Sequence, residues 1–184
     1  MIQCVIFDCD GTLVDSEHLS TLALELQLRG CGVQESAAAL LDAYKGWKLA
    51  EICRVLEAKH SIRLPESFVP DYRQLVEKLF AEQLQPIPGI VHALSEIRLP
   101  KCVASSGPPE KIDQSLSLTG LKPFFGERIF SSYVVHSWKP DPGLFLHAAE
   151  VMGFPPADCA VVEDSEVGIQ AALRAGMRAF WFTH

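Results

Sequence analysis

The stretch that decides the fold is residues 2–16, which read Ile-Gln-Cys-Val-Ile-Phe-Asp-Cys-Asp-Gly-Thr-Leu-Val-Asp-Ser. Its apolar run ends abruptly at Asp8 and Asp10, which is typical of a buried parallel strand whose carboxyl end opens into a site. Alternate side chains of an extended segment point the same way, so we expect these two carboxylates to face one small volume and to attract a cation. Gly11 permits a sharp turn, and Thr12 places a hydroxyl beside the carboxylates.

The pattern changes to helical after this stretch. Apolar residues recur at helical spacing in three stripes, which begin at Leu19, at Leu49 and, after Pro70, at Tyr72. From Gly89 onward, helical patterns alternate with short apolar runs, and these runs are expected strands at residues 102–104, 128–130, 159–162 and 179–182. Such alternation predicts an α/β protein with a Rossmann-like parallel sheet, whose ligand site lies at the carboxyl ends of the strands. We therefore expect an α/β core from residues 1–16 and 86–184, with an all-helical insertion at residues 17–85.

The composition narrows the function classes. The chain of 184 residues carries a formal net charge of −7 and shows no Lys/Arg cluster, which argues against nucleic-acid and anionic-membrane partners. The six cysteines show no CxxC pair and favour reduced thiols over a disulfide framework or a zinc site. The first residues pass into the expected strand without the basic and apolar segments of a signal peptide, so we expect a cytoplasmic protein.

The string Asp-Cys-Asp-Gly-Thr-Leu-Val-Asp-Ser resembles the first motif of the haloacid dehalogenase superfamily, whose members are aspartate-nucleophile phosphohydrolases. Three further places resemble the later motifs of that family, in the right order. They are Ser105 after the strand at 102–104, Lys139 in Lys-Pro-Asp-Pro, and the pair Glu163-Asp164.

This resemblance implies a mechanism and a cofactor. Asp8 would be the nucleophile that forms an aspartyl-phosphate, and Asp10 the general acid and base. Ser105 and Lys139 would contact the phosphoryl group, with help from Ser106 and Gly107. Magnesium is the implied cofactor, because it prefers carboxylate oxygens, water and phosphate. Its implied ligands are the Asp8 carboxylate, the Asp10 backbone carbonyl, Asp164 and Glu163, the last either directly or through water.

The helical insertion resembles the cap of the β-phosphoglucomutase-like branch of this superfamily. In that branch a Lys-Gly loop of the cap reaches the substrate, and the corresponding string here is Lys45-Gly46-Trp47-Lys48. The resemblance therefore implies substrate-binding roles for Glu17, His18, Lys45, Gly46 and Lys48. For Lys48 the alternative is an exposed lysine in a first helical turn, and for His18 a solvated or capping histidine.

The predicted function is that of a magnesium-dependent phosphatase acting on a small sugar phosphate or sugar-acid phosphate such as 6-phosphogluconate. Two alternatives stay open: a phosphomutase of the β-phosphoglucomutase kind, and a truncated, non-catalytic relative. The second arises because the chain ends two residues after its last expected strand, where an open sheet is expected to continue with a helix. The expected partner is a small phosphorylated metabolite, and the expected assembly is a monomer or a weak homodimer.

Overall fold

The computed structural model describes residues 1–183 and divides into two compact units. The core unit consists of Met1–Asp15 together with Gln85–His184, and the helical unit consists of Ser16–Leu84. Each unit has its own set of buried apolar residues.

The core unit is built on a five-stranded parallel sheet in the order β3-β2-β1-β4-β5. Its strands are β1 (Cys4–Phe7), β2 (Lys101–Ser105), β3 (Ile129–Ser131), β4 (Cys159–Glu163) and β5 (Arg178–Trp181). The central strand is therefore β1, the stretch that carries the first motif, with β2 and β4 on either side. This arrangement confirms the predicted α/β fold with a Rossmann-like parallel sheet.

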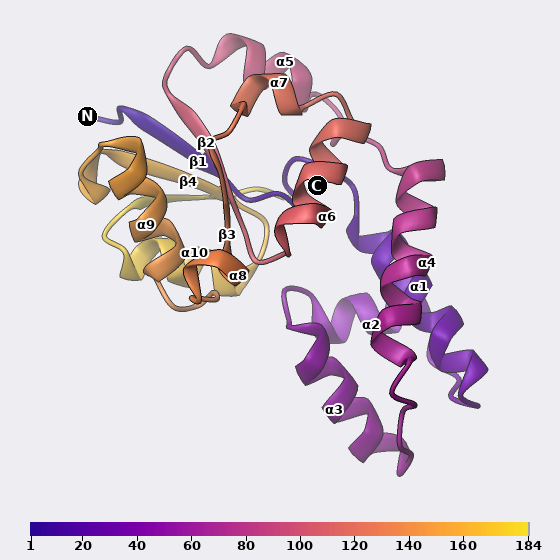
Figure 1. The fold of residues 1–184 in the computed structure, drawn as a ribbon. Coiled ribbons are helices and arrows are strands. Elements are labelled where there is room, and N and C mark those ends of the chain that lie inside the picture. Colours follow the sequence, from indigo (N-terminus) through magenta and orange to yellow (C-terminus); the bar gives the residue numbers. More distant parts are fainter. Residues whose placement is uncertain (184) are drawn as a thin grey trace. The chain divides into compact units, whose positions relative to one another are not determined.

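Helices connect the strands of the core unit (Figure 1). They are α5 (Ile90–Glu96), α6 (Pro109–Leu118), α7 (Lys122–Phe125), α8 (Ser132–Val135), α9 (Gly143–Met152), a 3₁₀ turn (Pro156–Asp158) and α10 (Glu166–Arg174). The sequence patterns predicted the longer helices but missed α7 and α8. A helix of four residues is barely one turn, so it shows no apolar period.

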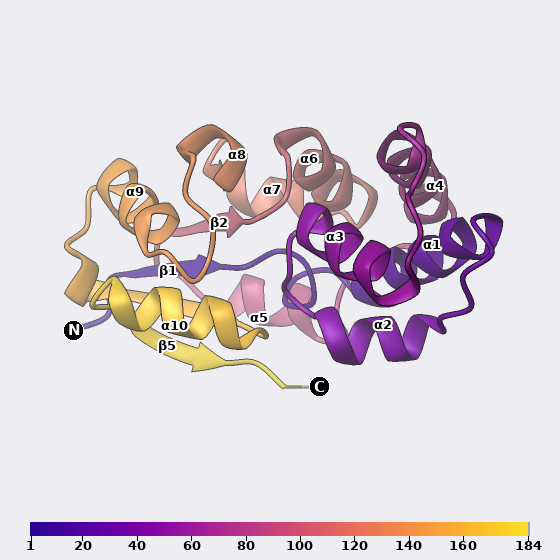
Figure 2. The same cartoon turned by 90° about the horizontal axis from the view of Figure 1, so that it is seen from below.

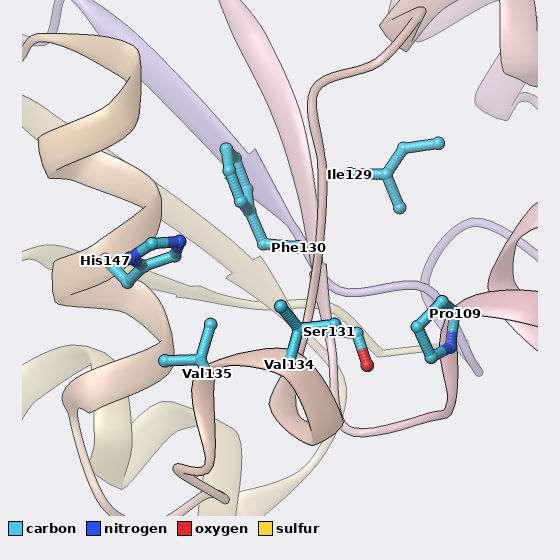
Figure 3. Close-up of a pocket in the computed structure, with 7 residues that line it drawn as sticks. All are labelled: Pro109, Ile129, Phe130, Ser131, Val134, Val135 and His147. Atoms are coloured by element: carbon cyan, nitrogen blue, oxygen red, sulfur yellow. The ribbon is translucent and has the colours of Figure 1, made fainter.

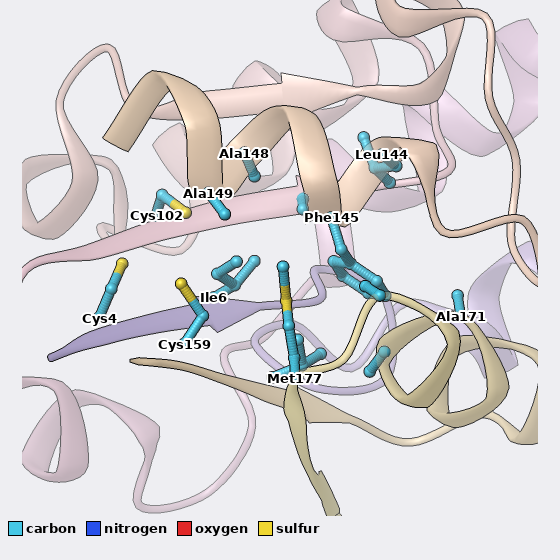
Figure 4. Close-up of a cluster of buried hydrophobic side chains, with 14 residues drawn as sticks. Cys4, Ile6, Cys102, Leu144, Phe145, Ala148, Ala149, Cys159, Ala171 and Met177 are labelled. Carbon is cyan, nitrogen blue, oxygen red and sulfur yellow. The ribbon is translucent and has the colours of Figure 1, made fainter. Parts of the chain in front are cut away.

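Alternate residues of β1 pack against different helices. Cys4 and Ile6 belong to a buried cluster with residues of α9 and α10, and Figure 4 shows these side chains facing one another across the sheet surface. Phe7, by contrast, makes an edge-to-face contact with Phe125 of α7, with ring centroids 6.1 Å apart. Burial on both faces explains why β1 is a continuous apolar run. A site can form at its carboxyl end, where polar residues follow.

The helical unit contains α1 (Glu17–Gly30), α2 (Ala37–Tyr44), α3 (Leu49–His60) and α4 (Phe68–Gln83), which Figure 2 shows from a second side. Their apolar faces enclose a buried cluster that includes Leu28, Leu56 and Phe68. The expected entry of the last helix after Pro70 was wrong, since α4 begins at Phe68. Proline is tolerated in the first turn because backbone N–H groups there have no acceptor within the helix, so the N–H that proline lacks costs no helical hydrogen bond.

The two segments that link the units pair with each other inside the core unit. The N–H of Asp15 donates to the carbonyl of Gln85 over 2.9 Å, and the N–H of Ile87 donates to Leu13 over the same distance. Within residues 1–183, none of the helices is both long and apolar enough to cross a membrane. The six cysteines are present as free thiols.

Candidate active site

Three buried carboxylates gather at the carboxyl ends of β1 and β4. Asp8 follows directly after β1, and its N–H donates to the carbonyl of Val162 over 3.0 Å, which extends the pairing of the two strands by one residue. Glu163 ends β4 and Asp164 follows it. Since neighbouring parallel strands end at the same edge of a sheet, the pairing of β1 with β4 brings these carboxylates together.

Lys139 lies between two of these carboxylates. Its ammonium donates to Oδ1 of Asp8 and, over 2.6 Å, to Oε1 of Glu163, and its side chain is only 3% exposed. The ammonium also lies 5.1 Å from the centre of the Phe145 ring. Burying a lysine this deeply is unfavourable unless its charge is compensated, so these contacts make Lys139 an integral part of the site.

The loop that carries Lys139 is fixed by its own hydrogen bonds. Asp141 accepts one from the hydroxyl of Ser137 over 2.7 Å and one from the N–H of Gly143 over 2.8 Å. These two bonds hold the pKa of Asp141 below its usual value. The carboxylate therefore stays ionised and keeps the start of α9 attached to the lysine loop.

The second carboxylate oxygen of Glu163 accepts hydrogen bonds from Ser165, the residue that precedes α10. The N–H and the hydroxyl of Ser165 donate to Oε2 of Glu163 over 2.6 and 2.8 Å. The carboxyl group also occupies the space beside Gly168, where an added Cβ would lie 2.0 Å from its Cδ and Oε1. The absence of a side chain at Gly168 is thus what permits Glu163 to reach Lys139.

The buried charges do not balance in the protein alone. Burial raises the pKa of Asp8 well above its usual range, Lys139 opposes this rise, and Glu163 and Asp164 add to it. For Lys139, burial acts to lower the pKa, but Asp8 and Glu163 outweigh it and raise the pKa above its usual value. The rise in the pKa of Asp8 comes mainly from burial, and the rise in the pKa of Lys139 comes from its two carboxylate partners. Three carboxylates nevertheless face one ammonium, so the cluster is short of positive charge.

The shape and chemistry of the cluster fit a divalent cation. One oxygen each from Asp8, Glu163 and Asp164 lies within 4.8 Å of the others. Gly11, at a φ of +77°, lets the backbone pass close to Asp164, since an added Cβ there would lie 2.2 Å from its Oδ2. Thr12 donates to the other oxygen, Oδ1, over 3.4 Å. Hard carboxylate oxygens of this kind suit Mg²⁺.

Asp10, the predicted general acid and base, lies in the tight turn after β1. Its carboxylate accepts a hydrogen bond from Lys111 of α6, with Oδ1 2.8 Å from Nζ. Both side chains are roughly a quarter exposed, in contrast to the enclosed pair of Asp8 and Lys139. No sequence pattern predicts the role of Lys111, because nothing in its spacing connects it with Asp10.

Ser105 ends β2 and is buried. Its hydroxyl oxygen accepts a hydrogen bond from the N–H of Gly107 over 3.1 Å, which folds Ser106 into a tight loop before α6. Ser131 of β3 donates to the carbonyl of Gly107 over 2.6 Å and fixes the loop from the neighbouring strand. Of the residues predicted to contact a phosphoryl group, all but Lys139 thus lie together at the carboxyl end of β2.

The other predicted substrate residues belong to the helical unit. Glu17 begins α1, and its carboxylate lies 3.0 Å from the ammonium of Lys45, the residue that follows α2. Gly46 has a φ of +80°, and Lys48 immediately precedes α3. His18 lies in the first turn of α1, where its carbonyl accepts a hydrogen bond from Thr21 over 3.1 Å. Contact of these residues with a substrate stays a prediction.

A small pocket lies elsewhere in the core unit, between α6, β3, α8 and α9 (Figure 3). It has a volume of about 90 Å³ and is mainly apolar. His147 contacts the ring of Phe130 edge-on across it, with centroids 5.6 Å apart. Its lining includes Ser131 but none of the residues that the sequence analysis assigned to the site.

The arrangement of sheet, carboxylates and buried lysine defines a class of protein, and a family comparison agrees with it. Residues 2–176 match the haloacid dehalogenase-like hydrolase family, so the chain belongs to that family and is a hydrolase of this type. The predicted resemblance is thereby confirmed.

Two curated relatives are similar over nearly the whole chain. A 6-phosphogluconate phosphatase from Escherichia coli is 37% identical, over 98% of this chain and 82% of the relative. A fructose-1-phosphate phosphatase from the same organism is 30% identical, over 95% of this chain and 93% of the relative. Both names support the predicted enzyme class, a phosphoric monoester hydrolase.

Solved structures resemble this one closely. A haloacid dehalogenase-like protein of unknown function from Agrobacterium tumefaciens superposes with a TM-score of 0.90 at 34% identity, covering 100% of this chain and 83% of the other. A putative β-phosphoglucomutase from Thermotoga maritima superposes with a TM-score of 0.81 at 28% identity, covering 100% of this chain and 86% of the other.

Proposed function

We propose that this protein is a magnesium-dependent phosphatase that hydrolyses a small sugar phosphate or sugar-acid phosphate through an aspartyl-phosphate at Asp8. The observation that carries the proposal is the contact of the Asp8 carboxylate with Lys139 inside the buried acidic cluster. A carboxylate that is fixed beside a buried ammonium at a strand end is suited to attack an electrophile that enters from that edge of the sheet.

In the first half of the reaction, an oxygen of Asp8 attacks phosphorus and the bond between phosphorus and the ester oxygen breaks. Asp10 gives its proton to the departing alkoxide. Lys139 offsets the negative charge of the attacking carboxylate, and the hydroxyl of Ser105, which accepts from Gly107, has its own hydrogen left to donate to a phosphoryl oxygen.

In the second half, a water molecule attacks phosphorus, Asp10 takes the proton of that water, and inorganic phosphate leaves Asp8. Asp8, Asp164 and Glu163, with the backbone carbonyl of Asp10, would hold the magnesium ion. When bound, that ion supplies the positive charge that the cluster lacks and offsets the charge of the phosphate.

We further propose that residues 17–85 act as a cap that contributes Glu17, His18, Lys45, Gly46 and Lys48 to substrate recognition. The Lys45–Glu17 ion pair supports this part of the proposal, because it holds the Lys-Gly loop to the start of α1. Two lysines in one loop suit an anionic substrate, and the name of the 6-phosphogluconate phosphatase suggests which anion to try first.

The test is phosphate release from a panel of sugar phosphates that includes 6-phosphogluconate and fructose 1-phosphate, with and without Mg²⁺. We expect release to need Mg²⁺ and to fall by about 10³-fold or more in Asp8→Asn, which removes the nucleophile but keeps the volume of the side chain. A folded wild-type protein that releases phosphate from none of these compounds would overturn the proposal.

A second candidate is a phosphomutase, which is favoured by the structural likeness to the putative β-phosphoglucomutase. A mutase needs the same nucleophile but transfers the phosphoryl group back to sugar rather than to water. The same panel separates the two, because a mutase yields an isomerised sugar phosphate with little inorganic phosphate.

A further inference from the structure

The core unit places two lysines against the predicted catalytic aspartates, and these lysines differ in kind. Lys139 is enclosed, contacts both Asp8 and Glu163, and has little freedom to move. Lys111 is partly exposed and contacts Asp10, from which it is separated by 101 residues of sequence. A long-range ion pair to the residue that must handle the leaving group is a feature that the mechanism above does not use.

The backbone around Lys111 holds its side chain close to the phosphoryl loop. Pro109 begins α6 two residues before Lys111, so the lysine lies in the first turn of that helix. An added Cβ on Gly107 would meet Cδ of Lys111 at 3.7 Å and Oγ of Ser105 at 3.5 Å. The aliphatic stem of the lysine therefore passes beside the loop that presents Ser105, and its ammonium reaches Asp10 from there.

Asp10 needs such a contact more than Asp8 does. Asp8 still pairs with the carbonyl of Val162, whereas Asp10 lies in the turn beyond, and the Asp10 side chain is 27% exposed. An exposed carboxyl group on a turn samples several rotamers, and catalysis by proton transfer depends on holding the group at the correct place. A charge-assisted hydrogen bond of 2.8 Å restricts those rotamers.

We propose that Lys111 is a positioning residue for Asp10: its ammonium bonds Oδ1 and holds the carboxyl group so that Oδ2 carries the proton that passes to the leaving-group oxygen. The inference rests on the proposed phosphatase function and deepens it. Lys111 then acts through Asp10 rather than on the phosphate, which distinguishes it from Lys139 and Ser105.

The proposal can be tested by comparing two substrates whose leaving groups differ in their need for a proton. An alkyl phosphate such as 6-phosphogluconate must have its departing oxygen protonated, whereas p-nitrophenolate leaves without a proton. We expect Lys111→Met to lower kcat/KM for the alkyl substrate by about 10-fold or more and for p-nitrophenyl phosphate by no more than about 3-fold, since correct general acid catalysis contributes about 10²–10⁴-fold. Lys111→Arg, which keeps the donor, should restore part of the alkyl activity.

A double-variant cycle makes the assignment specific. When Asp10 has already been changed to Asn, adding Lys111→Met should lower the rate by less than about 2-fold, because the residue it acts through is gone. The matched control is Lys122→Met, which removes another lysine that pairs with an aspartate, Asp113, at the surface of the same unit. It should leave both substrates unaffected.

Three results would overturn the proposal. Equal losses with the alkyl and the aryl substrate, or a further large loss in the Asp10→Asn background, would make Lys111 a phosphate ligand. An unchanged alkyl rate in Lys111→Met would leave it a surface lysine. If the wild-type protein hydrolyses neither substrate, the proposed function itself fails and this inference fails with it.

Discussion

In the core unit Lys139 is 3% exposed between two buried carboxylates, whereas in the helical unit Lys45 is 34% exposed beside Glu17. The first arrangement removes charges from water and, with Asp164 included, leaves two carboxylates in excess over the one ammonium, which weakens the fold unless a cation binds. The second changes stability little, because exposed ion pairs contribute only about 0.2–1 kcal/mol. The buried charges of the core unit are therefore costly to the fold, as expected of a site with the proposed function, whereas the ion pair of the helical unit costs the fold little.

The largest expected effect comes from removing the buried ammonium. Lys139→Met leaves Asp8 and Glu163 without their shared partner, so we expect the free energy of unfolding to fall by about 3–5 kcal/mol. In the helical unit, Lys45→Met should change the melting temperature by only about 1–2 °C. Thermal unfolding of both variants in EDTA measures the difference, and equal shifts would contradict the contrast between the units.

Metal binding should come next. Mg²⁺ at about 100 times its Kd should stabilise the wild-type protein by about 2.7 kcal/mol, since it binds only the folded cluster. Asp164→Asn removes one of the three clustered carboxylates and should abolish most of this gain. Asp113→Asn, an exposed carboxylate on α6, is the matched control and should keep the gain in full. The measurement is the change in melting temperature on adding Mg²⁺ to the wild-type protein and to each of the two variants.

Alanine substitutions at two glycines should have opposite effects on stability. Gly168→Ala should destabilise the core unit by about 1–3 kcal/mol and lower phosphate release, because the new methyl group would displace Glu163. Gly30→Ala at the end of α1 meets nothing within 4 Å and should stabilise the helical unit by about 0.5–1 kcal/mol with unchanged activity. Denaturant unfolding gives both values. A neutral Gly168→Ala would mean that Glu163 is not confined as described.

The smallest expected effect is a pH dependence in the helical unit. Hydrogen bonds from Lys59 and then His60 lower the pKa of Glu35 from its ordinary value of 4.5. A lowered pKa in the folded state adds stability above about pH 4.5 that is lost as the pH falls through the lower folded value.

Glu35→Gln should therefore lower the melting temperature by about 1–2 °C near pH 7 and by less near pH 3. The measurement is a comparison of melting curves for the variant and the wild-type protein at the two pH values. A difference that is as large at the lower pH would show that the charge of Glu35 is not what stabilises the unit.

The sequence predicted the fold and the inner site for a physical reason. Parallel strands end at one edge of a sheet, so polar residues after β1 and β4 had to meet, and the resemblance of Lys139 to a known motif added the ammonium. Lys111 could not be found in this way, because it lies inside a helix and has no spacing relation to Asp10. The helical start at Phe68 was missed because proline in a first turn looks like a boundary when read from sequence alone.

The supports of the site were also hidden in the sequence. Ser165 lies beside the Glu-Asp pair, but only the structure shows that its N–H and hydroxyl both hold Glu163. The confinement of Glu163 by Gly168 depends on how α10 packs against the end of β4, which no local pattern encodes. Sequence motifs therefore identified residues that the structure gathers into one buried cluster, while tertiary packing determines how those residues are held.

The most direct test of the account is to locate the phosphoryl group during turnover. The Asp10→Asn variant, which lacks the base for the second half-reaction, is mixed with Mg²⁺ and p-nitrophenyl phosphate, whose leaving group needs no proton from Asp10. The mixture is quenched in acid and treated with borohydride, which reduces an aspartyl-phosphate to homoserine. Peptide mass spectrometry should find homoserine at residue 8 and nowhere else. Turnover with an unmodified Asp8, or a phosphoryl group on Ser105, would contradict the assignment of Asp8 as the nucleophile.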